Sequence, residues 1–432
     1  MRYKTMKTSG WGRAIWASGD IARPERTAAL TDATAPAIGN RRSYGDAALN
    51  DGGRAIDMTR LDRILSFDRK TGLITVEAGV PIATLATICA PKGWLPRVMP
   101  GTGFATVGGC IAMDVHGKNH HGAGSFGQHV TAITLIQNGK PRQIGPGDKT
   151  LWAATIGGLG QTGIIAQATL QLMACKGDIM MVTERRAEDW AEHIALLDAS
   201  DATYCVGWID ATATGPKLGR GILEEAETGG GLVPAPKTAK KVPFNAPDFA
   251  LSAPVVRAFN AAYYRRVPQA GRTVVKPIQD FFFPLDRIRD WNKLYGKRGF
   301  HQFQCVVPLA ARSALREMLE LIAGSGLASP LAVLKRMGPG RAGMMSFPTE
   351  GYTLAVDFPN RAAARDLIAA LEDMTIDAGG RIYLAKDALA TGARVKAMYP
   401  EHGAWTKAVN AADPDYRLAT DLIRRLDLRS AI

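Results

Sequence analysis

The sequence predicts an α+β protein with two domains. Its 432 residues exceed what one ordinary hydrophobic core accommodates. A composition of 46% hydrophobic and 22% charged residues is typical of a globular chain. Near residue 176 the pattern changes from β-branched runs and glycine-rich turns to alternating helical and strand patterns. We therefore expect domains at 1–176 and 177–378, followed by a segment at 379–432.

Four elements are expected in the first domain. "GLITVEAGV" (72–80) predicts a strand that ends in a turn. "PIATLATICAPKG" (81–93) predicts a helix, with proline at its first turn and glycine just past its end. "HVTAITLIQNGKPRQIG" (129–145) predicts a hairpin that turns at Asn-Gly. The alternation in "GIIAQATLQLMAC" (163–175) predicts a half-buried strand.

The second domain should combine helices and strands. "ARSALREMLELIAGSG" (311–326) predicts a helix, and "FHQFQCVVP" (300–308) and "GYTLAVDFP" (351–359) predict strands. The segment 219–249 is rich in Gly, Pro and Lys, and we expect a long, mobile loop there. Helical patterns follow residue 386.

Charge and cysteine usage narrow the function classes. A formal net charge of +13 favours anionic partners. Zinc-finger spacing and the aromatic motifs of RNA-binding domains are both missing, so nucleic acid is not an expected partner. The five cysteines are widely spaced, without a CxxC pair, and predict neither a zinc ribbon nor a disulfide framework. The N-terminus has no apolar signal region, and no run is long enough to span a bilayer; both predict a cytoplasmic protein.

The stretch "DVHGKNHHGAGSFGQHV" (114–130) holds four of the seven histidines. A metal site is not expected, because His120 and His121 are adjacent and point apart, and no nearby Cys or Glu completes a ligand set. "GGLGQTG" (157–163) contains the GxGxxG pattern. It follows a helical pattern and precedes a strand, which is the reverse of a Rossmann loop, so that meaning is rejected.

Three glycine-bearing loops remain to be explained: 39–50, 100–119 and 157–163. Successive backbone N–H groups in such loops bind phosphate oxygens. Each loop alone could be an ordinary tight turn. Three in one domain favour a long ligand lying across the backbone, such as a dinucleotide.

These loops, "GNRRSYGDAALN", "PGTGFATVGGCIAMDVHGKNHHGAGSFGQHV" and "GGLGQTGII", resemble the FAD-binding domain of the vanillyl-alcohol-oxidase superfamily. Within it, the sequence is most similar to the flavoprotein oxidase subunits of decaprenylphosphoryl-β-D-ribose 2-epimerases. "FFFPLDRIRDWNKLYGKRGFHQFQCVVP", "VDFP" and "GGRIYLAKD" extend the resemblance over nearly the whole chain. It implies a PCMH-type FAD-binding fold, a substrate domain built on an antiparallel sheet, and a C-terminal segment that returns to the first domain.

The resemblance also assigns residues to the cofactor. Residues whose backbone should bind the diphosphate and adenosine are Asn40, Arg41, Arg42, Ser43, Tyr44, Gly45, Pro100, Gly101, Thr102, Val107 and Gly108. Residues that should contact the flavin are Gly117, Asn119, Gly160, Gly163, Ile165, Tyr44 and Tyr383.

Other residues are assigned to the substrate. His116 and Lys118 should lie where flavin and substrate phosphate meet, because a buried phosphate needs a nearby cation. Gln302 and Gln304 share one face of a strand and can hold sugar hydroxyls. The remaining members of the expected pocket are Trp208, Lys335, Thr353 and Ala355.

Lys386 is the candidate catalytic residue, with Tyr44 and His116. A cation near N1 would stabilise the reduced flavin. If burial lowers its pKa, Lys386 could instead deprotonate the hydroxyl. The two roles stay open at this point.

Two departures from the family matter. Several superfamily members attach FAD through a histidine in the first loop, and Arg42 stands in that region here, so non-covalent FAD is expected. Some family members carry a cysteine where this chain has Ala355.

The resemblance implies FAD-dependent oxidation of the 2-hydroxyl of a polyprenyl-phosphate-linked ribose to the 2-keto sugar, the first half of epimerisation to arabinose. A separate short-chain NAD(P)H-dependent reductase would complete the epimerisation. The protein would then sit peripherally at the inner face of the plasma membrane. The alternatives are an aldonolactone or alditol oxidase that acts on a free sugar, and a non-catalytic flavin- or lipid-binding protein.

Overall fold

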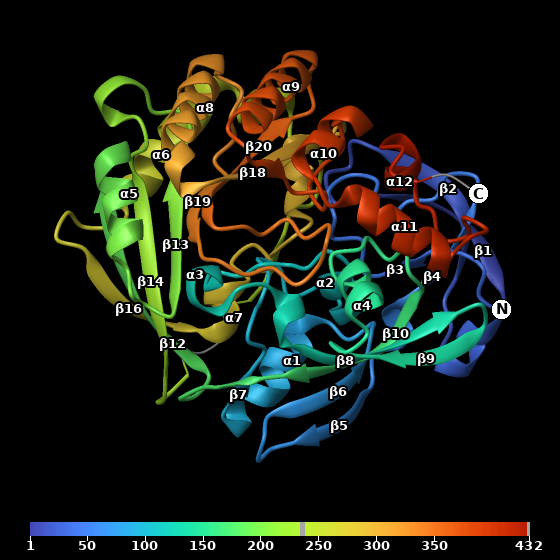
Figure 1. Cartoon of the computed structure of the whole chain (residues 1–432). Helices are drawn as coiled ribbons and strands as arrows, with labels where there is room; N and C mark the ends of the chain where they lie inside the picture. Colours follow the sequence, from blue (N-terminus) through green and yellow to red (C-terminus); the bar gives the residue numbers. More distant parts are fainter. Residues whose placement is uncertain (234–237, 430–432) are drawn as a thin grey trace.

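The computed structural model describes residues 1–233 and 238–429, which form two halves built on β-sheets (Figure 1). The first half holds a four-stranded sheet, β1-β2-β4-β3, and a five-stranded antiparallel sheet, β5-β6-β10-β8-β9. The strands of the first are β1 (Tyr3–Ser9), β2 (Trp16–Ala22), β4 (Arg54–Asp57) and β3 (Ala37–Ile38). Those of the second are β5 (Ile64–Asp68), β6 (Leu73–Glu77), β10 (Ile164–Gln171), β8 (Val130–Gln137) and β9 (Lys140–Ile144).

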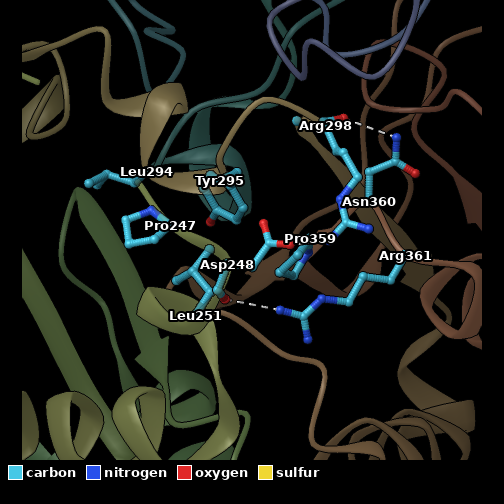
Figure 2. Close-up of a pocket in the computed structure, with 10 residues that line it drawn as sticks. Pro247, Asp248, Leu251, Leu294, Tyr295, Arg298, Pro359, Asn360 and Arg361 are labelled. Carbon is cyan, nitrogen blue, oxygen red and sulfur yellow. Dashed lines mark hydrogen bonds and ion pairs between the residues drawn. The ribbon is translucent and has the colours of Figure 1, made fainter. Parts of the chain in front are cut away.

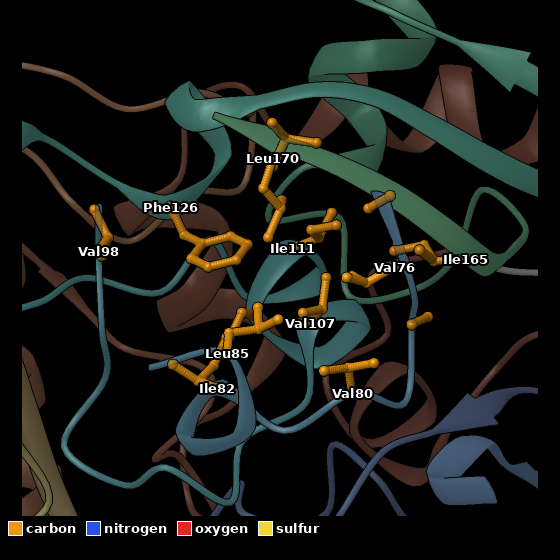
Figure 3. Packing of buried hydrophobic residues seen from close by; sticks show 14 of the residues in the cluster. Val76, Val80, Ile82, Leu85, Val98, Val107, Ile111, Phe126, Ile165 and Leu170 are labelled. Carbon is orange, nitrogen blue, oxygen red and sulfur yellow. The ribbon is translucent and has the colours of Figure 1, made fainter. Parts of the chain in front are cut away.

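Short helices and a hydrophobic core fix the loops of this half. The helices are α1 (Ile82–Cys89), α2 (Val107–Ala112), α3 (His120–Ala123) and α4 (Lys149–Thr155). Figure 3 shows Val107 and Ile111 of α2 packed among side chains of α1 and β10. A Cβ at Gly108 would lie 3.0 Å from the Ala78 Cβ, so glycine lets α2 approach the chain after β6 closely. The second glycine loop is thereby anchored through α2.

An eight-stranded antiparallel sheet forms the second half, in the order β16-β12-β14-β13-β19-β20-β18-β21. Its strands are β16 (Arg272–Pro277), β12 (Ile179–Ala187), β14 (Gly221–Gly229), β13 (Tyr204–Ile209), β19 (Ala332–Met337), β20 (Gly351–Pro359), β18 (Phe300–Val307) and β21 (Arg381–Ile382). Three helices cover one face (Figure 1): α5 (Trp190–Ala199), α8 (Arg312–Ser325) and α9 (Ala362–Asp377). The other face meets the first half.

Part of the contact between the two halves is hydrophobic. Tyr204 and Val182, from the sheet face away from the helices, belong to the same core as α1 and α2. Phe281 and Phe282 of α7 (Ile278–Phe282) complete it, and their rings contact Tyr204 edge-on. The sheet face that meets the first half therefore shares a core with it, while a separate core lies under α5, α8 and α9.

After β21 the chain crosses to the first half. Three helices follow, α10 (Gly392–Met398), α11 (His402–Ala412) and α12 (Asp421–Arg425). Arg425 binds Asp46 of the first loop through Nε and Nη2 (2.6 and 2.9 Å) and Asp387 through Nη2 (2.8 Å). This ion pair network joins the C-terminal segment to the first half, as the family pattern implies.

Small elements complete the connections. Two two-stranded pairs form, β7 (Trp94–Leu95) with β11 (Met173–Ala174), and β15 (Lys240–Lys241) with β17 (Ile288–Arg289). Helix α6 (Ala253–Arg265) lies beside β13. No helix of residues 1–233 and 238–429 is long and apolar enough to cross a membrane.

Most of the elements expected from the sequence are confirmed. β6, α1, the β8–β9 hairpin and β10 fall inside their expected ranges, as do α8, β18 and β20. Asn138 and Gly139 turn the hairpin with φ of 48° and 74°.

The loop expected at 219–249 is wrong for its first part, because Gly221–Gly229 is strand β14. Neighbouring strands supply cations to the glutamates of this strand. Glu224 accepts from Lys276 (3.1 Å), and Glu225 pairs with Arg185 (3.1 Å). Residues 234–237 of that expected loop lie outside the described residues.

Candidate active site

The three glycine loops meet at one place in the first half. Asn40 Nδ2 donates to Phe104 O (3.1 Å), which ties the first loop to the second. Gly157 N donates to Ile111 O (2.9 Å), which ties the third loop to α2. The loops that the sequence singled out are thus one structural unit.

Two glycines of this unit face open space. At Gly101 and Gly160, an added Cβ would meet no atom within 4 Å. Gly160 also has φ of 75°, which favours glycine. A ligand can therefore approach the backbone closely at both positions.

Buried polar atoms around the loops fit a nucleotide cofactor. Among the described residues, several buried side-chain atoms have no hydrogen-bond partner within the protein. A buried polar atom without a partner lowers the stability of the folded protein. They are Arg42 Nε, Asn119 Oδ1, Ser125 Oγ and Gln161 Oε1. FAD carries donors and acceptors on its ring, ribityl chain and diphosphate that can satisfy such atoms.

Not every expected cofactor contact is supported. The amides of Val107 and Gly108 donate to Val80 O (2.9 Å) and Ala78 O (2.8 Å). Donation from these two amides to a diphosphate, as the resemblance implied, is therefore not supported. Ile165 lies in the hydrophobic core next to α2 (Figure 3), so its flavin contact stays a prediction.

His116 stands at the boundary between the two halves. Lys335 Nζ lies 3.0 Å from its Nδ1, and the Gln304 amide nitrogen lies 3.1 Å from its Nε2. The rings of Phe347 and Tyr383 both lie 5.5 Å away. Burial, followed by the charge of Lys335, holds the pKa of His116 well below its usual range, so the imidazole is neutral at pH 7.

Lys386 comes from the tight turn that follows β21. Its amide donates to Tyr383 O (2.8 Å), and the next residue, Asp387, accepts from the amides of Leu389 and Ala390 (both 2.9 Å). The Lys386 Nζ lies 3.6 Å from the centroid of the Tyr44 ring. Tyr44 is in turn held by its amide, which donates to Ala385 O (2.9 Å). The structure thus brings together two residues that the sequence placed beside the flavin.

Lys118 and Lys335 extend a row of amines away from Lys386. Burial lowers the pKa of Lys335 to about 7, helped by the charges of Lys118 and then Lys386. Burial lowers the pKa of Lys118 to about 8. Lys118 donates to Phe281 O and lies 3.9 Å from the centre of that ring. The Lys118 and Lys335 amines bond carbonyl oxygens and an imidazole rather than carboxylates. An anion bound between them would therefore interact with two cations that form no ion pair with a carboxylate.

The face of β18 and β20 that meets the first half carries the expected sugar-binding groups. Gln302 pairs with Asp357 across the strands, and Gln304 pairs with Ala355. The Gln304 amide also donates to Thr353 Oγ1 (3.3 Å). Cys305, by contrast, points to the opposite face, where its Sγ lies 4.0 Å from Met318 Sδ of α8.

Trp208 shares this sheet face but lies further along it. It pairs with Val333, two residues before Lys335. Its Nε1 donates to Pro330 O (2.9 Å), and its ring lies 4.7 Å from that of Tyr263 on α6. By register, Trp208 therefore lies level with Ala355 and Gln304, on the other side of β19.

Three residues of the site were missed by the sequence analysis. The alternation of β20 places Asp357 on the same face as Thr353 and Ala355, but the sequence analysis assigned it no role. Tyr295 ends a short 3-10 helix and Phe347 lies in an irregular segment, and in neither does sequence periodicity predict the direction of the side chain.

Two of the other histidines in the 114–130 stretch bond backbone carbonyls. His121 and His129 bond the carbonyls of Ala202 (2.8 Å) and Ala123 (2.7 Å). In the part of the chain that the structure describes, no group of three or more His, Cys, Asp or Glu side chains could hold a metal ion.

Comparison with known proteins agrees with this geometry. Residues 20–145 match the FAD binding domain family. The chain is 36% identical, over 98% of its own length and 98% of the relative's, to the decaprenylphosphoryl-β-D-ribose oxidase of Mycolicibacterium smegmatis. The chain belongs to this oxidase family. It is an FAD-dependent oxidoreductase with the two-domain PCMH-type fold.

Matches to two other enzymes are shorter. An L-gulono-1,4-lactone dehydrogenase of Mycobacterium tuberculosis is 31% identical over 38% of this chain and 40% of its own. A D-lactate dehydrogenase of Anaerostipes hadrus is 29% identical over 30% of this chain and 29% of its own.

Proposed function

We propose that this oxidase converts the 2-hydroxyl of a polyprenyl-phosphate-linked ribose to the 2-keto sugar, the first half of epimerisation to arabinose. The observation that carries the proposal is the row of amines formed by Lys386, Lys335 and Lys118 beside the flavin loops. An anionic substrate with its sugar at Lys386 and its phosphate near Lys335 and Lys118 uses all three amines.

Each side chain then has a task. Gln302 and Gln304 hold sugar hydroxyls through their amides, and neutral His116 offers one further polar contact. Bound FAD supplies the acceptor for the hydride that leaves C2. Lys386 either receives the hydroxyl proton or provides positive charge beside the reduced ring.

The cofactor is expected to be held without a covalent bond. Arg42 lies where superfamily members carry the attachment histidine, and its guanidinium is 4.2 Å from the Trp11 ring and 4.5 Å from the Phe104 ring. An arginine in this position offers no nucleophile for flavin attachment.

The partners follow from the product. A 2-keto sugar must be reduced from the other side to give arabinose, which calls for a separate short-chain NAD(P)H-dependent reductase. A polyprenyl tail requires access to lipid, so we place the enzyme peripherally at the inner face of the plasma membrane. Exposed Phe244 and Phe249, close in sequence to Lys240 and Lys241, support such a contact.

The substrate choice is tested by anaerobic reduction of the bound flavin. A short-chain prenyl-phosphoryl-β-D-ribose should bleach the flavin, whereas free ribose and L-gulono-1,4-lactone should not. K118M and K335M should weaken binding of the phosphorylated substrate while FAD stays bound. Bleaching by the lactone and not by the prenyl-phosphoryl sugar would instead establish the aldonolactone oxidase alternative, for which the two lysines have no anion to bind.

A further inference from the structure

Asp357 is a fully buried carboxylate in the middle of the proposed sugar site. It lies on β20, on the face that meets the first half, and has no exposed surface. Gln302 Nε2 donates to its Oδ1, and the Tyr295 hydroxyl lies 3.2 Å from its Oδ2. Neither the sugar nor the cofactor contacts proposed above uses this group.

Tyr295 holds Asp357 from outside the sheet. It belongs to the short helix Trp291–Tyr295, and its hydroxyl also lies 2.8 Å from Ser329 Oγ. Its ring stacks on Phe300 at 4.1 Å. Figure 2 shows Tyr295 lining an outer pocket with Leu294 and Pro359. The hydroxyl of the same side chain reaches Asp357.

Asp357 and Lys386 are linked through shared neighbours. The Lys386 amine lies over the Tyr44 ring, and that ring packs against Phe300 at 5.3 Å. Phe300 in turn stacks on Tyr295, whose hydroxyl bonds Asp357. Burial raises the pKa of Asp357, and the nearby Lys386 charge opposes that rise. Burial lowers the pKa of Lys386, and Asp357 opposes that fall. A buried charge without a partner is costly, so each group determines the charge of the other.

We propose that Asp357 is a positioning residue, which acts through the side chains around it to determine the charge of the Lys386 amine, so that the two groups hold and release one proton as a unit. The inference rests on the proposed function, since it deepens the proton transfer at that site. When the sugar is oxidised, the C2–H bond breaks and its electron pair leaves with the hydride to FAD. The O–H proton passes to Lys386 Nζ, with Asp357 as the counter-charge.

Other titratable groups face the pair. They are Tyr295 from its short helix, Tyr44 from the first loop, Lys335 from β19 and His116 from the second loop. Burial keeps the pKa of each tyrosine well above its usual range, and it keeps His116 neutral. Lys335 is the remaining cation that titrates near neutral pH, with a pKa of about 7.

The test is the pH dependence of flavin reduction in D357N, measured by stopped flow with a prenyl-phosphoryl-ribose. Loss of the carboxylate removes the charge that raises the pKa of Lys386, so the limb of the profile that belongs to Lys386 should move to lower pH by about 1–3 units. The direction is the same whether the amine acts as a base or as a charge. A limb that stays in place in D357N, while the wild type is reduced normally, would overturn the inference and leave the proposed function intact.

Infrared difference titration of the holoenzyme provides a readout that does not depend on turnover. A protonated buried carboxyl has its own C=O band, which D357N should remove. In K386M this band should persist to higher pH, because the charge that lowers the pKa of Asp357 is gone. An Asp357 band that K386M leaves unchanged would contradict the pairing, even if the prenyl-phosphoryl sugar proved not to be a substrate.

Two further variants serve as a control and as a substitute for D357N. E372Q is the matched control, because Glu372 is another buried carboxyl, with its pKa raised to about 8, and it lies on α9 behind the sheet. E372Q should leave the limb in place; a shifted limb would assign it to Glu372 instead. If D357N does not fold, Y295F removes one hydrogen bond from the carboxylate and should keep the infrared band to higher pH.

Discussion

A single substitution of Lys386 should strongly reduce catalysis. In K386A the flavin loops are untouched, so FAD should remain bound. Flavin reduction by substrate should fall roughly 100- to 1,000-fold, because a fixed charge or base beside the reacting atoms is lost. Rapid-scan absorbance of the bound flavin measures both quantities. Unchanged reduction in K386A would remove both roles proposed for the amine.

Arg42 supports a second prediction about one residue. Because an arginine occupies the region of the attachment histidine, acid precipitation should release intact FAD into the supernatant. Mass spectrometry of the supernatant and of the pellet decides it. A pellet that stays yellow, with a peptide from 39–50 carrying the mass of FAD, would show covalent attachment.

Single residues also show where sequence reasoning reaches its limit. The lysines of the site were assigned through the family resemblance, and the two glutamines also through their alternation on one strand. The hydrogen bond between Tyr295 and Asp357 could not be predicted, because these residues are 62 positions apart and meet only after a short helix docks on the sheet. Long-range side-chain contacts of this kind leave no local pattern.

At the level of elements, helix α9 carries a buried carboxyl whose titration should be visible in stability. Burial raises the pKa of Glu372 from 4.5 to about 8. The folded state therefore binds one more proton than the unfolded state between these values, and stability is lost as pH rises through that window. E372Q removes the titration, so its Tm should fall less than that of the wild type between about pH 5 and about pH 8.5.

Differential scanning calorimetry across this range is the measurement. E317Q, at an exposed position of α8, provides a control that should follow the wild type. If E372Q follows the wild type as well, Glu372 does not titrate in the folded protein as its burial implies.

Elements with strong periodicity or clear end signals were predicted well. Helix α1 begins just after Pro81 and is followed by Gly93 at φ of 80°, both visible in the sequence. Strand β14 was not predicted, because the cations that neutralise its glutamates come from β12 and β16. A charged strand in the middle of a sheet can be recognised only when its neighbours are known.

At the scale of the whole molecule, the exposed apolar residues are unevenly distributed. Phe244 and Phe249 are each 70% exposed, and Phe259 is 51% exposed. Basic side chains such as Lys240 and Lys241 lie on the same part of the chain. Each lysine near an anionic bilayer is worth about 1 kcal/mol, and this attraction weakens with salt.

The protein should therefore bind vesicles of anionic lipid, and high salt should weaken the binding. A double variant, F244S with F249S, should reduce sedimentation with the vesicles. The control is L65S, since Leu65 is also exposed, at 45%, but lies on β5 of the first half. Equal sedimentation of all three proteins would exclude this surface as the membrane contact.

The ion pairs of Arg425 have a consequence for synthesis on the ribosome. Asp46 and Arg425 are separated by 379 positions, yet together with Asp387 they clamp the turn that carries Lys386. The amino-terminal loops are translated first. Arg425 is added only when nearly the whole chain has been synthesised, so its ion pairs with Asp46 and Asp387 cannot form earlier. A transcript that terminates upstream of Arg425 would yield a polypeptide with its flavin loops present but its key lysine unanchored. Catalytic competence is thus conferred late in translation.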